Sequence, residues 1–187
     1  MSAIVLGAIR QALTEYLPQR MDTVGARLMM LTIQKQEDPE ERRYQLVKRT
    51  EATALENIVG PKTAKGPARG LWQFEQGGGI KGVLQHNKTG NWIDDVCDRF
   101  GVTNSSVSCW KAIEENDVLA ACFARLLLWS DPKLSLPGIM DAKGALALYL
   151  RTWRPGAWTR GNDEQRNALE VKFLKNHAAA RLELNIQ

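Results

Sequence analysis

Near the middle of the chain, glycine residues bracket a run of large side chains: Gly66-Pro67-Ala68-Arg69-Gly70-Leu71-Trp72-Gln73-Phe74-Glu75. Two interpretations fit this run. It is a tight turn that packs Leu71 and Phe74 into a core, or it lines a polysaccharide cleft. In a cleft, Trp72 offers a flat face to a sugar ring, and Gln73 offers both a hydrogen-bond donor and an acceptor. Composition alone favours the packing turn, because binding clefts use few, specifically placed polar groups.

Helical patterns surround this run on both sides. Apolar residues at helical spacing predict a first helix that Pro18 ends, and a buried second helix that Asp22 or Thr23 caps. After the run, the same spacing predicts a helix that ends at Gly101. Three later helices are predicted over residues 117–129 with Asn116 as cap, from Asp141 to a break at 153–156, and over about 163–183 as an amphipathic helix.

Two polar regions complete the pattern. Residues 40–58 are highly charged with a weak apolar stripe, and we expect a solvated helix or helix pair there. Three glycines and two prolines within residues 60–70 predict a loop. Because no convincing strand run is present, the sequence predicts an all-α fold in a single domain that spans residues 1–187.

The bulk composition limits the class of protein. A chain of 187 residues with 44% apolar side chains fits one globular domain. Its net charge of +4 suits an anionic polymer, which includes nucleic acid, cell wall and membrane surfaces. Cys97, Cys109 and Cys122 lack tight spacing, which predicts reduced, buried thiols rather than a disulfide framework or a zinc site. With His86 and His177 as the two imidazoles, we expect no metal site, no catalytic triad and no cofactor.

The sequence also bears on the compartment. No apolar run approaches the ~18 residues of a membrane helix, so no membrane span is predicted. The first nine residues are too short and too uncharged for a signal peptide. We therefore expect a protein that is made in a cytoplasm and is not exported by that route.

Residues 70–73, Gly-Leu-Trp-Gln, resemble the Gly-Leu-x-Gln signature of lytic transglycosylases and goose-type lysozymes. Over about residues 24–157 the chain is more closely similar to phage lysozyme-like proteins. In these, Gln-Glu-Ser is followed by an Arg-rich stretch, by Gly-Pro-Ala-Arg-Gly and by an aromatic-Trp-Gln-Phe-Glu block. The matching segments here are Leu31 to Glu37, Arg42 to Gln45, Gly66 to Glu75, Gly77 to Leu84, Asp117 to Ala121, Leu126 to Trp129, and Tyr149 to Gly156.

The resemblance implies a single lysozyme-like helical domain that degrades peptidoglycan. In this family the Glu that closes the Gln-Glu-Ser helix is the general acid, which here implies Glu37. Such an acid must stay protonated near neutral pH in order to protonate the leaving oxygen. Burial at the end of an apolar helix favours the protonated form. One Glu suffices, because the N-acetyl group of the sugar assists and the sugar's own hydroxyl closes an anhydro ring.

Two departures from the family pattern leave alternatives for the acid. Asp38 follows Glu37 where the family has Ser, and this carboxylate either raises the proton affinity of Glu37 or replaces a needed hydrogen bond. The Gly-Leu-Trp-Gln motif begins 33 positions after Glu37, about twice the usual family separation. The extra length falls in a charged insertion at about residues 46–65. Glu56, 14 positions before that motif, and Glu51 are therefore alternative acids, although a solvated helix face explains both.

The resemblance also implies a set of substrate contacts, each with a structural alternative. The hydroxyl of Tyr149 orients the acid, or its ring is a core side chain. Glu75 contacts the substrate or is a buried ion-pair partner of Arg69. Trp153 floors a sugar or peptide subsite or belongs to a capping turn. The substrate-binding residues implied are Trp72, Gln73, Glu75, Tyr149, Trp153 and Arg154.

The resemblance further implies a bacteriophage protein. We expect a virion component in a tail or head–tail assembly, or a lysis protein released from the host cytoplasm, which acts on the cell wall in the periplasm. Its expected partners are peptidoglycan glycan strands and other virion proteins. The 46–65 insertion is expected to contact a neighbouring subunit. The alternative is a structural virion protein with the same fold and little or no activity. Nucleic-acid binding is a third hypothesis, but the basic residues at 42–49 are interleaved with Glu40, Glu41 and Glu51, which argues against a phosphate-tracking face.

Overall fold

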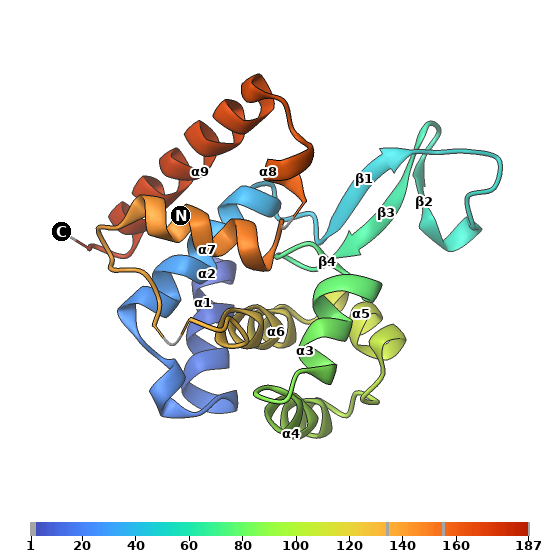
Figure 1. Ribbon diagram of the computed structural model, residues 1–187. Helices are drawn as coiled ribbons and strands as arrows, with labels where there is room; N and C mark the ends of the chain where they lie inside the picture. The colour runs from blue at the N-terminus through green and yellow to red at the C-terminus, as the bar shows by residue number, and fades with distance from the viewer. Residues whose placement is uncertain (1–2, 134, 155, 187) are drawn as a thin grey trace.

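The structure, a computed structural model, describes residues 3–133, 135–154 and 156–186. Helix α6 (Asp117–Trp129) lies at the centre of the helical body (Figure 1). Nine of its 13 residues are buried, because it is apolar on nearly all sides. Asn116 caps it as predicted, since its side-chain oxygen accepts a hydrogen bond from the Leu119 amide at 2.9 Å. The other helical elements are α1 (Ala3–Gln11), η1 (Ala12–Tyr16), η2 (Gln19–Met21), α2 (Val24–Glu37), η4 (Gln76–Ile80), α3 (Lys81–Gln85), α4 (Gly90–Phe100), α5 (Ser106–Glu115), α7 (Ala142–Thr152), α8 (Ala157–Arg160) and α9 (Asp163–Glu183).

Most of the predicted helix boundaries are confirmed. The first helical segment ends before Pro18, and the hydroxyl of Thr23 caps α2 by accepting from the Ala26 amide at 3.1 Å. Gly101 ends α4 in the left-handed conformation, with φ of 65°. The carboxylate of Asp141 caps α7. These ends follow from local chemistry, so local sequence was enough to predict them.

The all-α prediction is wrong. The chain is α+β, with 62% helix and a four-stranded antiparallel sheet. The predicted helix or helix pair at residues 40–58 and the predicted loop at 60–70 contain most of this sheet, which projects from the helical body (Figure 1). Strand β3 lies between β1 and β2. Strand β2 pairs with the start of β3, and β4 pairs with its end at Ala68 and Arg69. The sheet elements are β1 (Tyr44–Lys48), η3 (Leu55–Asn57), β2 (Ile58–Gly60), β3 (Thr63–Arg69) and β4 (Phe74–Glu75).

The sequence pattern did not indicate the strands, because the sheet buries almost no large apolar side chain. The inward positions of β3 include Ala64, Gly66 and Ala68, which are too small to show as an apolar alternation. A Cβ at Gly66 would collide with the side chains of Gln45 and Val47 on β1, so this glycine allows the two strands to approach. A strand built on small residues and exposed charges therefore resembles a loop in the sequence.

The charged insertion at 46–65 is the outer part of this sheet, from the end of β1 to the start of β3. Its connecting turn carries Leu55, which is 84% exposed. Elsewhere, the three cysteines are free and buried, as predicted. Among the described residues, no helix combines the length and the apolar character that crossing a bilayer requires.

Candidate active site

Glu37 is the last residue of α2, and its side chain is only 11% exposed. One carboxyl oxygen accepts a hydrogen bond from the hydroxyl of Tyr149 at 2.5 Å. The other oxygen lies 3.9 Å from a guanidinium nitrogen of Arg154. The structure thus brings together three of the residues implied by the resemblance, from α2, from α7 and from the segment that follows α7.

The surroundings of Glu37 favour its protonated form. Burial raises its pKa above the ordinary value near 4.5 and outweighs the Tyr149 hydrogen bond and the charges of Arg154 and Lys172, which act in the opposite direction. Its position at the C-terminal end of α2, where the helix dipole is negative, also disfavours the carboxylate. Burial and the charge of Glu37 raise the pKa of Tyr149, so its hydroxyl remains a donor at neutral pH. A carboxyl group that stays protonated is what general acid catalysis requires.

Helix α9 holds this end of α2 in place. The ring of Tyr149 is buried and stacks on Phe173 of α9, with ring centroids 5.0 Å apart. Lys172 donates from Nζ to the carbonyl of Gln36 at 2.7 Å, and Asn176 donates to the side-chain oxygen of Gln36 at 2.8 Å. Sequence reasoning missed Lys172 and Asn176, because they contact α2 across 136 and 140 positions and no local pattern marks them.

Asp38 stabilises the turn that follows Glu37. Its carboxylate accepts the backbone amides of Arg42 at 3.1 Å and Arg43 at 2.8 Å. These partners belong to the turn, so the contacts of Asp38 bear out neither of the two roles considered for it beside Glu37.

Removing this carboxylate tests its stabilising role in the turn. Asp38→Ala leaves two amides in the turn without partners, so we expect the free energy of unfolding to fall by about 1–3 kcal/mol. Chemical denaturation measures this, with Asp95→Ala on the exposed face of α4 as a control that should stay within about 0.5 kcal/mol of the wild type. Equal stabilities of the two variants would contradict the structural role of Asp38.

Arg43 connects this turn to the glycine-bounded run. Its guanidinium forms a two-pronged ion pair with Asp117 at 2.8 and 2.7 Å, and its carbonyl accepts the amide of Gly70 at 2.8 Å. Glu41, Arg43 and Gln73 all have φ between 51° and 63°, which non-glycine residues seldom adopt. Such strain persists only where surrounding contacts over-determine the backbone, and it concentrates at functional sites.

The glycine-bounded run consists of the end of β3, a packed turn at residues 70–73, and β4. Leu71, Trp72 and Phe74 are buried, and the indole of Trp72 donates to the carbonyl of Met30 in α2 at 2.8 Å. Trp72 is completely buried, so its ring faces are covered by protein in this structure. The side chain of Gln73 is half-buried and donates to the carbonyl of Gly70 at 3.0 Å within its own turn.

The Trp153 side chain links the run to the segment that carries Arg154. Its indole donates to the carbonyl of Trp72 at 3.2 Å, and its ring lies 5.6 Å from that of Phe74. Trp153 is half-buried, whereas the side chain of Arg154 is 53% exposed and is oriented toward Glu37. Pro155, part of the predicted break, lies outside the described residues.

The predicted ion pair between Glu75 and Arg69 is wrong. Arg69 is buried and pairs with Glu114 of α5 at 2.7 Å, while Glu75 is exposed on β4. The guanidinium of Arg69 also lies 4.5 Å from the Trp110 ring of α5 and donates to the side chain of Asn57 and to backbone carbonyls of β3. Within the described residues, neither Gln73 nor Glu75 makes a hydrogen bond or ion pair with Glu37.

The two alternative acids lie elsewhere. Glu51 and Glu56 are exposed in the outer part of the sheet, whereas Glu37 is nearly buried and contacts Tyr149. The geometry therefore favours Glu37 over both.

The described residues contain no group of three His, Cys, Asp or Glu side chains arranged to hold a metal ion. Comparison with known proteins gives no matching family model, no matching curated protein and no matching solved structure.

Proposed function

We propose that this protein cleaves the glycan strand of bacterial peptidoglycan between N-acetylmuramic acid and N-acetylglucosamine, with Glu37 as the general acid. The observation that carries the proposal is the nearly buried Glu37 carboxyl, held by the Tyr149 hydroxyl at 2.5 Å at the end of α2. The resemblance of the Gly-Leu-Trp-Gln and flanking motifs to phage lysozyme-like proteins supplies the substrate class. We place the protein in a phage particle, where it opens the wall locally.

In the proposed reaction, Glu37 gives its proton to the glycosidic oxygen as the bond to the sugar's anomeric carbon breaks. The N-acetyl oxygen of the same sugar attacks that carbon and carries the developing positive charge. Either the sugar's own hydroxyl or water then displaces it and returns a proton to Glu37. Tyr149 and Arg154 stabilise Glu37 while it is ionised, since one donates a hydrogen bond and the other is a nearby cation.

The test is incubation of the folded protein with purified peptidoglycan between about pH 4 and 8, the range in which carboxyl acids operate. We expect soluble fragments to be released. Mass spectrometry of their ends then separates the two routes, because the intramolecular route leaves anhydro ends and the water route leaves reducing ends. Release of no fragments by folded protein at any pH in this range would overturn the proposal.

A second candidate is a structural virion protein without activity. The observation that favours it is the 11% exposure of the Glu37 side chain, because substrate must reach a carboxyl that Tyr149 already contacts. Absence of fragment release from purified peptidoglycan, together with incorporation of the protein into phage particles, would favour this candidate.

Tyr149→Phe tests whether the hydroxyl of Tyr149 acts on the pKa of Glu37. Loss of the hydroxyl removes a hydrogen bond that lowers the pKa of Glu37, so that pKa should rise further. The alkaline limb of kcat/KM should therefore move to higher pH, by up to about 1 unit for one hydrogen bond. The measurement is a pH–rate profile, with Tyr44→Phe on β1 as control. An unmoved alkaline limb in Tyr149→Phe would show that the hydroxyl does not act on Glu37.

A further inference from the structure

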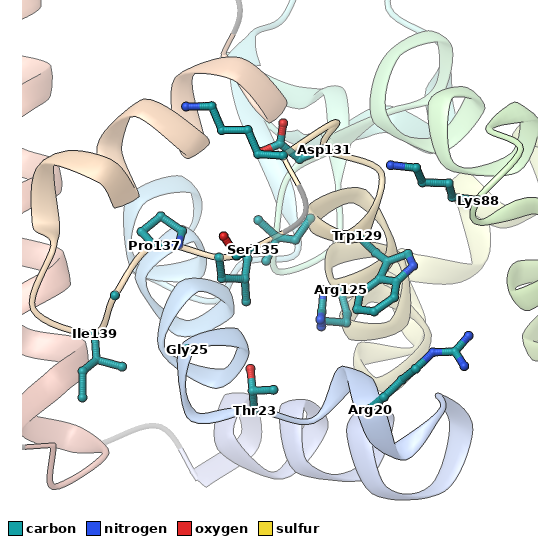
Figure 2. Close-up of a pocket in the computed structure, with 14 residues that line it drawn as sticks. Arg20, Thr23, Gly25, Lys88, Arg125, Trp129, Asp131, Ser135, Pro137 and Ile139 are labelled. Atoms are coloured by element: carbon teal, nitrogen blue, oxygen red, sulfur yellow. The ribbon is translucent and has the colours of Figure 1, made fainter.

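A pocket of about 600 Å³ lies beside the start of α2 (Figure 2), whereas Glu37 is the last residue of that helix. Thr23 and Gly25 at the start of α2 form one side, and Arg125 and Trp129 of α6 form another. Gly25 and Glu37 are 12 residues apart in one helix, which separates them by about 18 Å. This pocket is therefore distinct from the candidate active site, and the inference below does not depend on the proposed function.

The most unusual group in the pocket wall is Arg125, which is 2% exposed. Its Nε donates to the carbonyl of Met21 at 2.8 Å, but its Nη1 is buried and has no hydrogen-bond partner among the described residues. Asp22, whose charge acts on Arg125, is already paired with Arg27 at 2.7 Å. Burial lowers the pKa of Arg125 to about 10, so the side chain is still a cation at neutral pH. A buried cation without a full set of partners costs folding free energy that an anionic ligand would offset.

Other positive groups surround this cation. The ring of Trp129 lies between two guanidinium groups, 5.0 Å from that of Arg125 and 6.0 Å from that of Arg20. Lys88 and Lys133 line the mouth. The N-terminal end of α2, which carries partial positive charge, also faces the pocket.

The remaining charge and the apolar wall define the ligand further. Among the described lining residues, Asp131 is the one carboxylate, and it is paired with Arg151 at 2.6 Å. The pocket is therefore positive overall. The rest of its wall is largely apolar and contains Leu128, Leu136, Pro137 and Ile139. This combination suits a molecule with a negative head and a hydrocarbon part, and the volume is that of a small-molecule site.

We propose that this pocket binds a small amphipathic anion, with a carboxylate or phosphate group at Arg125 and the start of α2, and a short hydrocarbon chain against Leu136 and Ile139. A guanidinium recognises either head group through charge-assisted hydrogen bonds.

The test is titration of the protein with octanoate, octyl phosphate, 1-octanol and inorganic phosphate. Binding is followed by amide chemical shifts and by tryptophan fluorescence, to which Trp129 contributes. We expect at least one of the two amphipathic anions to bind and to shift the amides of lining residues. 1-Octanol, which has the hydrocarbon chain but no charge, should bind at least about tenfold more weakly. The stronger of octanoate and octyl phosphate identifies the head group, and inorganic phosphate should compete with either.

Three variants keep the proposal testable. Arg125→Met should weaken binding of the anion by about 10- to 100-fold, the loss expected for one charge-assisted hydrogen bond. Ser135→Glu places a negative charge on an exposed lining residue without touching the core, and it should also weaken binding at least severalfold. Arg10→Gln removes an exposed cation that does not line the pocket and should leave binding unchanged.

Two results would overturn the proposal. The first is equal affinity for 1-octanol and the amphipathic anions, with Ser135→Glu indistinguishable from the wild type, which would make the pocket merely apolar. The second is no binding of either anion up to about 10 mM, a concentration at which even weak specific sites are occupied. Because Ser135→Glu retains the whole core, either result holds even if Arg125→Met does not fold.

Discussion

Glu37→Gln is expected to lower the rate of glycan-strand cleavage by about 10²- to 10⁴-fold, the contribution of a positioned general acid. The amide has nearly the shape of the carboxyl and still accepts the hydrogen bond from Tyr149, so the fold should survive. It has no acidic proton to give to the leaving oxygen. The measurement is the initial rate of fragment release from purified peptidoglycan at the pH where the wild type is fastest, with circular dichroism to confirm folding.

Glu56→Gln and Glu51→Gln are the matched controls, because both side chains are exposed in the outer part of the sheet. Each should keep wild-type activity within about twofold, as expected for an exposed group that gives no proton to the reaction. If Glu56→Gln abolished release while Glu37→Gln remained active, the assignment of the acid would be wrong and the enzymatic proposal would stand.

The same Glu37→Gln variant carries a second, independent signature. Because the pKa of Glu37 is raised in the folded state, the folded protein holds more protons at this site than the unfolded chain does. The stability of the wild type therefore falls as pH rises from the ordinary carboxyl value near 4.5 through the raised pKa. The glutamine variant lacks this decline, so its free energy of unfolding relative to the wild type should increase across that range. Urea denaturation at a series of pH values measures the difference, and a constant difference would show that Glu37 is not perturbed.

Trp72→Ala is expected to lower the free energy of unfolding by about 3–5 kcal/mol, which is typical for a large aromatic side chain removed from a core. Trp72 is completely buried, and it connects the glycine-bounded run to Met30 and to Trp153 through two hydrogen bonds. Equilibrium denaturation in urea measures the loss. Trp158→Ala is the control, because that side chain is 37% exposed and should change stability much less.

The Trp72 experiment also tests the cleft interpretation of the same residue. If Trp72 provided a sugar-stacking face, its truncation would weaken glycan binding while leaving most of the stability. A Trp72→Ala protein as stable as the wild type but with a raised KM would contradict the packing role described here.

Local patterns predicted most of the long helices but not α3 or α5, and they did not predict the sheet at all. Thr23, Asn116 and Asp141 mark helix starts, because the side chain of each accepts a hydrogen bond from the amide three residues further on. The strand pairing of β1 with β3 joins Tyr44 to Arg69 and Lys48 to Thr63, and its buried positions are small or polar. Nothing in a short window distinguishes such a strand from a loop or a charged helix.

The candidate site also divides into residues that motifs identify and residues whose role depends on long-range packing. Glu37, Tyr149 and Arg154 were named from a resemblance of motifs, and the structure places them in contact. Lys172 and Asn176 were not named, because their role depends on how α9 packs along α2. The expected partner of Arg69 was misassigned to Glu75 for a related reason, since Glu114 lies on a helix 45 positions away.

The packing of α9 on α2 has a consequence for how the protein is made. A ribosome that has added Glu37 must add 112 more residues before Tyr149 exists, and 136 separate Gln36 from Lys172. Until then Glu37 lacks the Tyr149 hydroxyl and its helix lacks the contacts with α9. The surroundings of Glu37 are thus assembled only after most of the chain has been synthesised, so fragments from interrupted synthesis or early cleavage carry Glu37 without the contacts that surround it in the folded protein.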